Sequence, residues 1–237
     1  MKHMLSVAKL VVFLFLMACV KHQQPSASSV FSPDINTWRA HFKAVPNGVR
    51  LNGFEPSIGE VSADNTIVVF SNVQCATCKN EIPRIKKIVE QSNGHFRLLF
   101  KHFPLNRRCN PGLKETLRPR DCHIAQQLAC AGQQGQFWSF LELSLTQRLR
   151  TQRQINKSLK GLKMSVPAFF ECISEPAERQ NVIDDARSGQ QAGVMMLPTI
   201  FVFDNATQRW WRAKNGEQSI RQLHQWRKAG MLRFPSL

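Results

Sequence analysis

The amino-acid sequence predicts an α/β fold built on a central mixed β-sheet. The apolar run from Ile67 to Phe70 has the character of a buried strand, and a basic helical stretch follows at residues 79–89. A second apolar stretch at residues 95–105 completes a strand–helix–strand unit, so its two strands should be parallel with a right-handed crossover. Residues 121–191 then have a helical composition, and residues 199–212 have the pattern of an antiparallel hairpin.

The first residues predict an export signal that precedes the folded domain. Lys2, His3 and Lys9 flank the start of an apolar run that extends over residues 10–20. This run is too short for a helix that spans a bilayer, which needs about 20 residues. A basic start followed by a short apolar centre is typical of a secretory signal peptide, which we place at residues 1–18.

Residues 16–19, Leu-Met-Ala-Cys, resemble the bacterial lipobox, in which the cysteine receives a lipid. The resemblance implies lipidation of Cys19 and attachment to a membrane by that lipid anchor; ordinary cleavage with Cys19 unmodified is the alternative. Residues 19–32, rich in Gln, Ser, Pro and Ala, should then form a flexible tether. We therefore expect a lipoprotein of the bacterial cell envelope that faces the periplasm or another extracytoplasmic space, and Val20 favours the outer membrane.

The chain of 237 residues can bury one sizeable core or form one domain with an insertion. Its formal net charge is +16, and basic residues are scattered through every segment. Because no arrangement of these residues points to DNA or RNA, we expect no nucleic-acid partner. The charge fits attraction to anionic lipid headgroups, lipopolysaccharide or acidic client proteins, or simply a solvated surface that keeps the protein soluble.

Residues 33–54 are predicted to form an N-terminal helix and extension. Ser32, Pro33 and Asp34 have the pattern of a helix start. The helix should run through Trp38 and Phe42 and end near the Pro-Asn-Gly sequence at residues 46–48. Short strands and turns then lead to the central strand at residues 66–70.

Cys75-Ala76-Thr77-Cys78 lies between the central strand and the basic helix. A helix start offers unpaired N–H groups and a partial positive charge, which favour a thiolate over a thiol. Cys75, at that start, should attack or be attacked, and Cys78 should resolve the mixed disulfide. The alternatives are a permanent disulfide or half of a zinc site; no second cysteine pair or close His-x-x-His supplies further ligands, so we expect no metal and no cofactor.

Two segments carry a resemblance to a known family. Residues 67–78, IVVFSNVQCATC, are followed by Pro83, and residues 193–204, GVMMLPTIFVFD, come much later. The sequence resembles the DsbA-like thiol:disulfide oxidoreductases of the thioredoxin superfamily over about residues 55–230. The resemblance implies a thioredoxin-like fold at residues 55–237 with an inserted helical subdomain at about 119–191. It also implies that Pro198 follows a cis peptide bond and that Leu197 and Pro198 bind client peptides.

Two positions depart from the family pattern, and the two residues between the cysteines are uninformative. Many relatives bury an acidic residue six positions before the first cysteine, where this chain has Val69. Proton transfer to or from Cys78 must then use water or another acid. Leu197 replaces the usual threonine or valine, and Ala76-Thr77 says nothing about the reduction potential. The direction of electron flow therefore stays open.

The remaining cysteines should be paired in part. Seven cysteines are present, and leaving out Cys19 gives an even number, which permits full pairing in an oxidising compartment. Some DsbA-like sequences have a cysteine-bracketed loop at this point, so the resemblance implies a structural disulfide between Cys109 and Cys122. Cys130 and Cys172 lie in apolar helical settings, where free cysteine often packs as a core residue. Their pairing stays open.

The last elements close the domain. Apolar residues recur at helical spacing within 137–145, which indicates a side that faces the core. Residues 199–203 and 208–212 should form the two strands of the hairpin, and residues 217–228 should form an amphipathic helix.

Two hypotheses about function follow. The first is an exported oxidoreductase that exchanges its Cys75–Cys78 pair with cysteines of exported client proteins and is recycled by a separate redox partner. The second is a redox-inactive chaperone or assembly lipoprotein that uses the same fold only for binding. The short segment before the main domain leaves little room for a dimerisation domain, so we expect a monomer and disfavour an isomerase.

Overall fold

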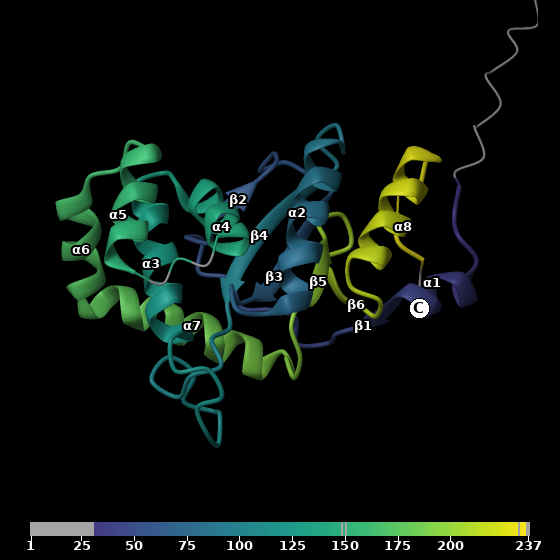
Figure 1. The fold of residues 1–237 in the computed structure, drawn as a ribbon. Coiled ribbons are helices and arrows are strands. Elements are labelled where there is room, and N and C mark those ends of the chain that lie inside the picture. Colours follow the sequence, from purple (N-terminus) through teal and green to yellow (C-terminus); the bar gives the residue numbers. More distant parts are fainter. Residues whose placement is uncertain (1–30, 148, 150, 232, 236–237) are drawn as a thin grey trace, which may run out of the picture. The chain divides into compact units, whose positions relative to one another are not determined.

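The computed structural model describes residues 31–147, 149, 151–231 and 233–235. The expected signal peptide, Cys19 and most of the tether lie outside the described residues. Six strands form one mixed sheet in the order β1-β6-β5-β3-β4-β2 (Figure 1). Their bounds are β1 Phe42–Ala44, β2 Ser57–Ile58, β3 Asn65–Ser71, β4 Phe96–His102, β5 Thr199–Asp204 and β6 Arg209–Ala213. The predicted α/β fold with a central mixed sheet is confirmed.

β3 and β4 form the centre of the sheet and pair in parallel, with Asn65 opposite Phe96 and Ser71 opposite His102. β5 lies on the other side of β3 and runs antiparallel to it, and β6 follows as the second strand of a hairpin. Every residue of β3 is buried, because helices or loops cover the sheet on both sides. The strand–helix–strand pattern predicted the parallel pair, and the pattern at residues 199–212 predicted the antiparallel hairpin; both are confirmed.

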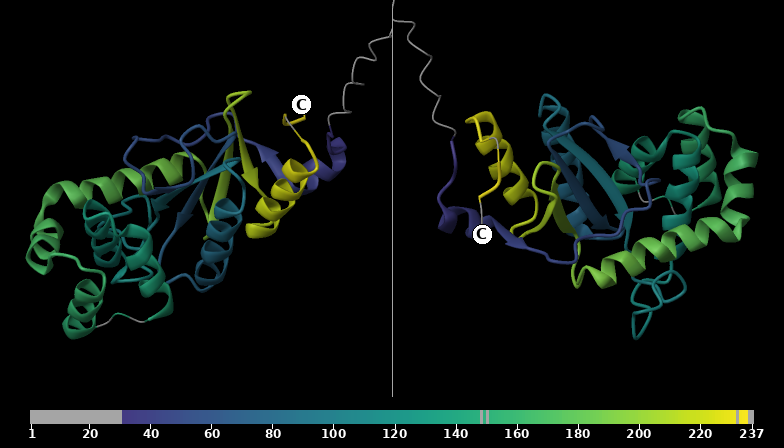
Figure 2. Two further views of the ribbon diagram at one scale, coloured as in Figure 1. Left: turned by 90° about the horizontal axis from the view of Figure 1, so that it is seen from above. Right: turned by 180° about the vertical axis from the view of Figure 1, so that it is seen from behind.

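Two helices cover one face of the sheet. α2 (Ala76–Glu90) connects β3 to β4, and α8 (Glu217–Lys228) packs beside it (Figures 1 and 2). Ile67 and Val69 of β3 belong to the core on this face, whereas Val68 and Phe70 belong to the core on the other face. This alternation of side chains along a strand is the reason that a single run of apolar residues can serve two layers.

The N-terminal helix ends earlier than predicted, and the chain then joins the sheet. α1 (Ile35–His41) is capped by Asp34, whose carboxylate accepts hydrogen bonds from two backbone N–H groups of the first turn. Phe42 is already extended, and β1 pairs antiparallel with β6. Pairing with a strand about 170 residues further along cannot be seen in the local sequence, which by itself favours continuing the helix. Trp38 is fully buried and fixes α1 to the core.

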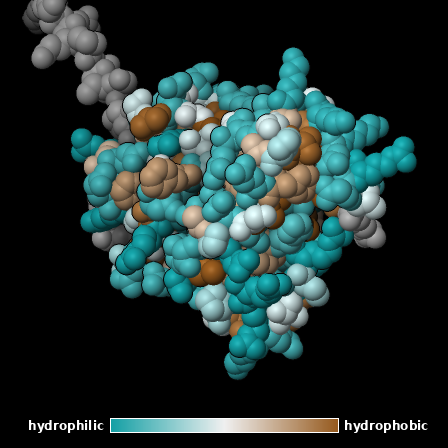
Figure 3. All heavy atoms as spheres, turned by 90° about the vertical axis from the view of Figure 1, so that its left-hand side faces the viewer, coloured by the Kyte–Doolittle hydropathy of each residue, from teal (hydrophilic) through white to brown (hydrophobic). Residues whose placement is uncertain are grey.

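Five helices form the insertion between β4 and β5: α3 Asp121–Gln133, α4 Phe137–Thr146, α5 Gln152–Gly161, α6 Val166–Ser174 and α7 Pro176–Gln191. A disulfide between Cys130 and Cys172 joins α3 to α6. The face of the molecule that Figure 3 shows is mostly hydrophilic, with apolar groups in separate places. Among the described residues, no helix combines the length and the apolar character that crossing a membrane requires.

A buried group of charges connects the insertion to the sheet. Lys101 of β4 donates to Glu55 at 2.9 Å and contacts Asp185 of α7 at 2.7 Å, and all three side chains are at most 9% exposed. Asp185 also accepts a hydrogen bond from the backbone N–H of His102. Burial raises the pKa of the Asp185 carboxyl to about 6, against the lowering effect of Lys101. Because α7 is held here, its last turn has a fixed position next to the end of β4.

Candidate functional site

The two cysteines of the Cys-x-x-Cys sequence form a disulfide at the start of α2. Cys75 is the N-cap residue of the helix, and its sulfur accepts a hydrogen bond from the Cys78 backbone N–H at 3.1 Å. The Cα atoms of the pair are 5.2 Å apart. Cys78 is fully buried, whereas Cys75 is only partly buried and lines a surface groove. An attacking group from another molecule can therefore reach Cys75 and not Cys78.

The segment before β5 lies next to the sulfur of Cys75. The Leu197–Pro198 peptide bond is cis, and the carbonyl oxygen of Leu197 lies 3.5 Å from Cys75 Sγ. Thr199 donates a side-chain hydrogen bond to the Met196 carbonyl at 2.7 Å, which steadies the segment just before the strand. Sequence positions 75 and 197 are thus brought together by the antiparallel pairing of β3 with β5.

A groove of about 660 Å³ runs beside Cys75. The segment before β5 forms one wall, where the side chains of Met195 and Met196 are 91% and 69% exposed. The opposite wall belongs to residues 104–120, here called the stapled loop, and includes Leu117, which is 57% exposed. Large apolar side chains seldom stay this exposed together unless they contact another molecule.

The stapled loop is held at both ends. A disulfide joins Cys109 to Cys122 at the start of α3. The Asn106 side chain donates to the Pro119 carbonyl at 2.7 Å, and the Leu117 and Arg118 N–H groups both donate to the Leu105 carbonyl at 2.9 Å. The loop therefore presents a defined surface to the groove.

The position that carries an acidic residue in many relatives is apolar here. Val69 is fully buried between its strand neighbours Phe100 and Ile200. Behind the turn from β3 to Cys75, a small cavity of about 10 Å³ is lined in part by His102 and Asp121. Burial lowers the pKa of the His102 imidazole to about 3 and raises the pKa of the Asp121 carboxyl to about 6. These two groups are the titratable residues that line this cavity, and neither occupies the place of Val69.

One group of possible metal ligands occurs among the described residues. Cys130, Cys172 and Glu178 place their ligand atoms within 4.8 Å of one another. The two sulfurs are joined in a disulfide, however, and a disulfide offers no thiolate to a metal ion. The Glu178 carboxylate instead accepts hydrogen bonds from the side chains of Gln133 and Asn181.

The fold and the Cys75–Cys78 pair together define a thiol–disulfide oxidoreductase. The sheet positions the partly buried Cys75 at a helix start, with its fully buried partner Cys78 one helical turn away. The chain belongs to the thioredoxin family, since the family described as Thioredoxin matches residues 52–220. Among curated proteins, none matches this chain.

Solved structures of DsbA-type proteins have the same fold. The structure of DsbA2 from Pseudomonas aeruginosa is 21% identical with a TM-score of 0.58, and the match covers 78% of this chain and 100% of that one. The thiol-disulfide exchange protein alpha-DsbA2 from Wolbachia pipientis is 15% identical with a TM-score of 0.57, covering 73% and 87%. A periplasmic thioredoxin-like protein from Salmonella enterica serovar Typhimurium is 16% identical with a TM-score of 0.56, covering 74% and 91%.

Sequence reasoning singled out Leu197 and Pro198 and missed the rest of the groove. Met195 and Met196 precede them directly, and two large apolar residues beside a turn were the available signal. No comparable signal marked Leu117, because its approach to Cys75 depends on how the stapled loop folds back over α7.

Proposed function

We propose that this protein is an exported oxidoreductase that exchanges the Cys75–Cys78 disulfide with cysteines of client proteins in the cell envelope. The observation that supports this most directly is the partly buried Cys75, which is bonded to a fully buried Cys78 and lines an open groove. A zinc half-site does not suit this pair, because no other His, Cys, Asp or Glu of the described residues is grouped with it to complete a metal site.

The exchange follows from the geometry. A client thiolate attacks Cys75 Sγ, the Cys75–Cys78 bond breaks, and its electron pair leaves on Cys78. A second client thiolate then attacks the client sulfur of the mixed disulfide and releases Cys75 as a thiolate. The Cys78 N–H group, 3.1 Å from the Cys75 sulfur, and the start of α2 stabilise this negative charge. The client gains a disulfide, the enzyme pair is reduced, and a separate redox partner must restore it; the reverse sequence reduces a client.

Leu197 and Pro198 would bind the client chain. The Leu197 carbonyl lies next to the reacting sulfur. An extended peptide that brings its cysteine to Cys75 can therefore donate a backbone hydrogen bond to the Leu197 carbonyl. The exposed side chains of Met195 and Leu117 would contact apolar residues of the client on the two sides. The Cys109–Cys122 disulfide is assigned a structural role, because both sulfurs are buried.

The location outside the cytoplasm is part of the proposal. The signal-like residues 1–18 and Cys19 support export and a lipid anchor, and the Salmonella protein with this fold is described as periplasmic. Three disulfides among the described residues are in keeping with an oxidising compartment. The tether at residues 19–32 would give the domain reach from a membrane surface, and we assign the domain as a monomer.

The test is oxidative refolding of a reduced client and insulin reduction, each followed with the wild-type protein, Cys75→Ser and Cys78→Ser. We expect Cys75→Ser to lose the catalysed rate, and Cys78→Ser to accumulate a mixed disulfide with the client that a reducing agent releases. Equal rates for wild type and Cys75→Ser would instead support the alternative, a chaperone or assembly lipoprotein without turnover. The reduction potential of the pair then distinguishes an oxidant, near about −120 mV, from a reductant, near about −270 mV.

A further inference from the structure

The stapled loop is both rigid and strongly basic. Within residues 104–120 it has five basic residues and one acidic residue. Its backbone is fixed by the Cys109–Cys122 disulfide and by hydrogen bonds across the loop. At Gly112 the loop presses on α7 so closely that an added Cβ would lie 2.1 Å from the Gln190 side chain. Its charges are therefore held in place beside the groove rather than spread over a moving segment.

Charge in the groove has one sign. Lys114 and Arg118 are the charged side chains among the residues that line it, and no carboxylate lines it. Both residues are exposed. Arg118 attracts the buried Asp121 carboxyl, whereas no ion pair joins Lys114 to any carboxylate in the described part of the chain. The groove thus has an apolar wall at Met195 and Met196 and a basic wall opposite.

Resting on the proposed function, we propose that this groove selects acidic clients. The preferred client segment has an apolar residue that contacts Met195 or Met196 and a carboxylate near its cysteine that pairs with Lys114 or Arg118. The selection acts on the rate at which client thiols reach Cys75, because complementary surface charges mainly accelerate encounter and orient the partner. Each exposed pair should change the rate by no more than about fivefold, and salt weakens it.

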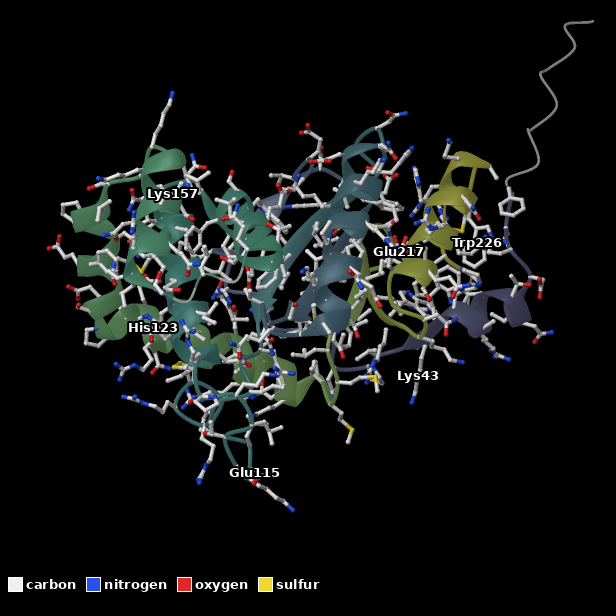
Figure 4. All side chains as sticks on the ribbon, in the orientation of Figure 1. Lys43, Glu115, His123, Lys157, Glu217 and Trp226 are labelled. Carbon is white, nitrogen blue, oxygen red and sulfur yellow. A yellow bond between two sulfur atoms is a disulfide. The ribbon has the colours of Figure 1, made fainter. Side chains whose placement is uncertain are left out.

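The general positive charge of the chain would also attract acidic peptides, so the test needs a control with the same change in net charge. Lys157 and Lys160 lie on α5. Figure 4 shows Lys157 at the upper left of the molecule and Glu115, which marks the stapled loop, at the bottom. The double variant Lys157→Glu/Lys160→Glu therefore changes the total charge as much as Lys114→Glu/Arg118→Glu does, but away from the groove.

The experiment measures the second-order rate at which reduced peptides open the Cys75–Cys78 disulfide of the oxidised protein. Three peptides share one cysteine and one leucine and differ by Glu, Gln or Lys at two flanking positions. Flanking charges change the pKa and the reactivity of the peptide's own thiol. Each rate is therefore divided by the rate at which the same peptide reacts with the neutral disulfide 4,4′-dithiodipyridine. Rates are taken for wild type and both double variants at low and high salt.

We expect the wild type to prefer the Glu peptide over the Gln peptide by about fivefold at low salt, with the Lys peptide slowest and the differences reduced at high salt. The loop variant should reverse this order and the α5 control should keep it. Equal normalised rates for the three peptides, or the same loss in both variants, would overturn the selection while leaving the exchange activity intact. If none of the peptides opens the disulfide, the proposed function itself is contradicted.

Discussion

Replacing Lys101 by Met should destabilise the protein strongly, because it leaves two carboxylates buried without their cation. Lys101 is 2% exposed, and its ammonium lies 2.9 Å from Glu55 and 2.7 Å from Asp185. Removing one partner of a buried ion pair costs about 3–5 kcal/mol, since the remaining charge keeps its desolvation penalty. With a urea m-value of about 2 kcal/mol/M, the unfolding midpoint should fall by about 1.5–2.5 M.

The stability that Lys101→Met loses should be smaller at low pH than at high pH. Burial already raises the pKa of Asp185 to about 6, above its value in the unfolded chain. Without Lys101 that pKa should rise further, so the folded variant takes up a proton more readily than the unfolded one as the pH falls. Lowering the pH from 8 to 5 therefore should reduce the deficit of Lys101→Met relative to wild type.

Urea unfolding followed by tryptophan fluorescence at both pH values measures these differences. Lys86→Met is the matched control, because Lys86 also contacts two carboxylates, Glu90 at 2.8 Å and Glu142 at 3.0 Å, but at the surface. Exposed pairs contribute about 0–1 kcal/mol, so this variant should lose little. Similar losses for the two variants, or a deficit of Lys101→Met that stays the same between pH 5 and pH 8, would refute the reasoning.

Two further predictions concern stability. Burial lowers the pKa of His102 to about 3 in the folded protein. At a pH between this pKa and the pKa of His102 in the unfolded chain, only the unfolded chain binds the proton. The fold therefore loses stability as the pH falls through that range. Compared with wild type, His102→Leu should therefore gain about 2–3 kcal/mol in free energy of unfolding between pH 7 and pH 4.5; a constant difference in urea titrations would contradict this. Changing Cys130 and Cys172 together to Ala should cost about 4 kcal/mol, and changing Cys109 and Cys122 about 3 kcal/mol, because the first pair closes the longer loop, with separations of 42 and 13 residues. Urea unfolding without reductant checks the order, and a larger loss for the shorter loop would show that chain entropy does not dominate.

The parts of the fold that the sequence predicted well are those whose signal is local. The helix at residues 217–228 has its apolar residues at helical spacing, and the strand pair after Pro198 has a polar turn between two apolar runs. β1 was not predicted, because only the distant β6 makes Phe42 extended. In the same way, nothing near Lys101 in the sequence indicates that Glu55 and Asp185 will surround it.

In the candidate site, too, the sequence predicted what depends on neighbouring residues and missed what depends on distant ones. A helix start after a buried strand is sufficient to place Cys75 and Cys78, since neighbouring residues create the environment of both. The pairing of Cys130 with Cys172 depends on how α3 packs against α6, so composition left it open. The basic wall of the groove could not be predicted either, because Lys114 and Met195 line the same groove only once the chain has folded.

The pairing of β1 with β6 has a consequence for where this domain can be cut. The family match spans residues 52–220, yet Phe42, Lys43 and Ala44 form the outermost strand of the sheet, and α8 continues to Lys228. A fragment trimmed to the family limits would lack β1, so the backbone N–H and C=O groups of β6 that pair with β1 would have no partner. An open sheet edge favours strand addition from a second molecule, so a shortened fragment should self-associate more than the longer chain.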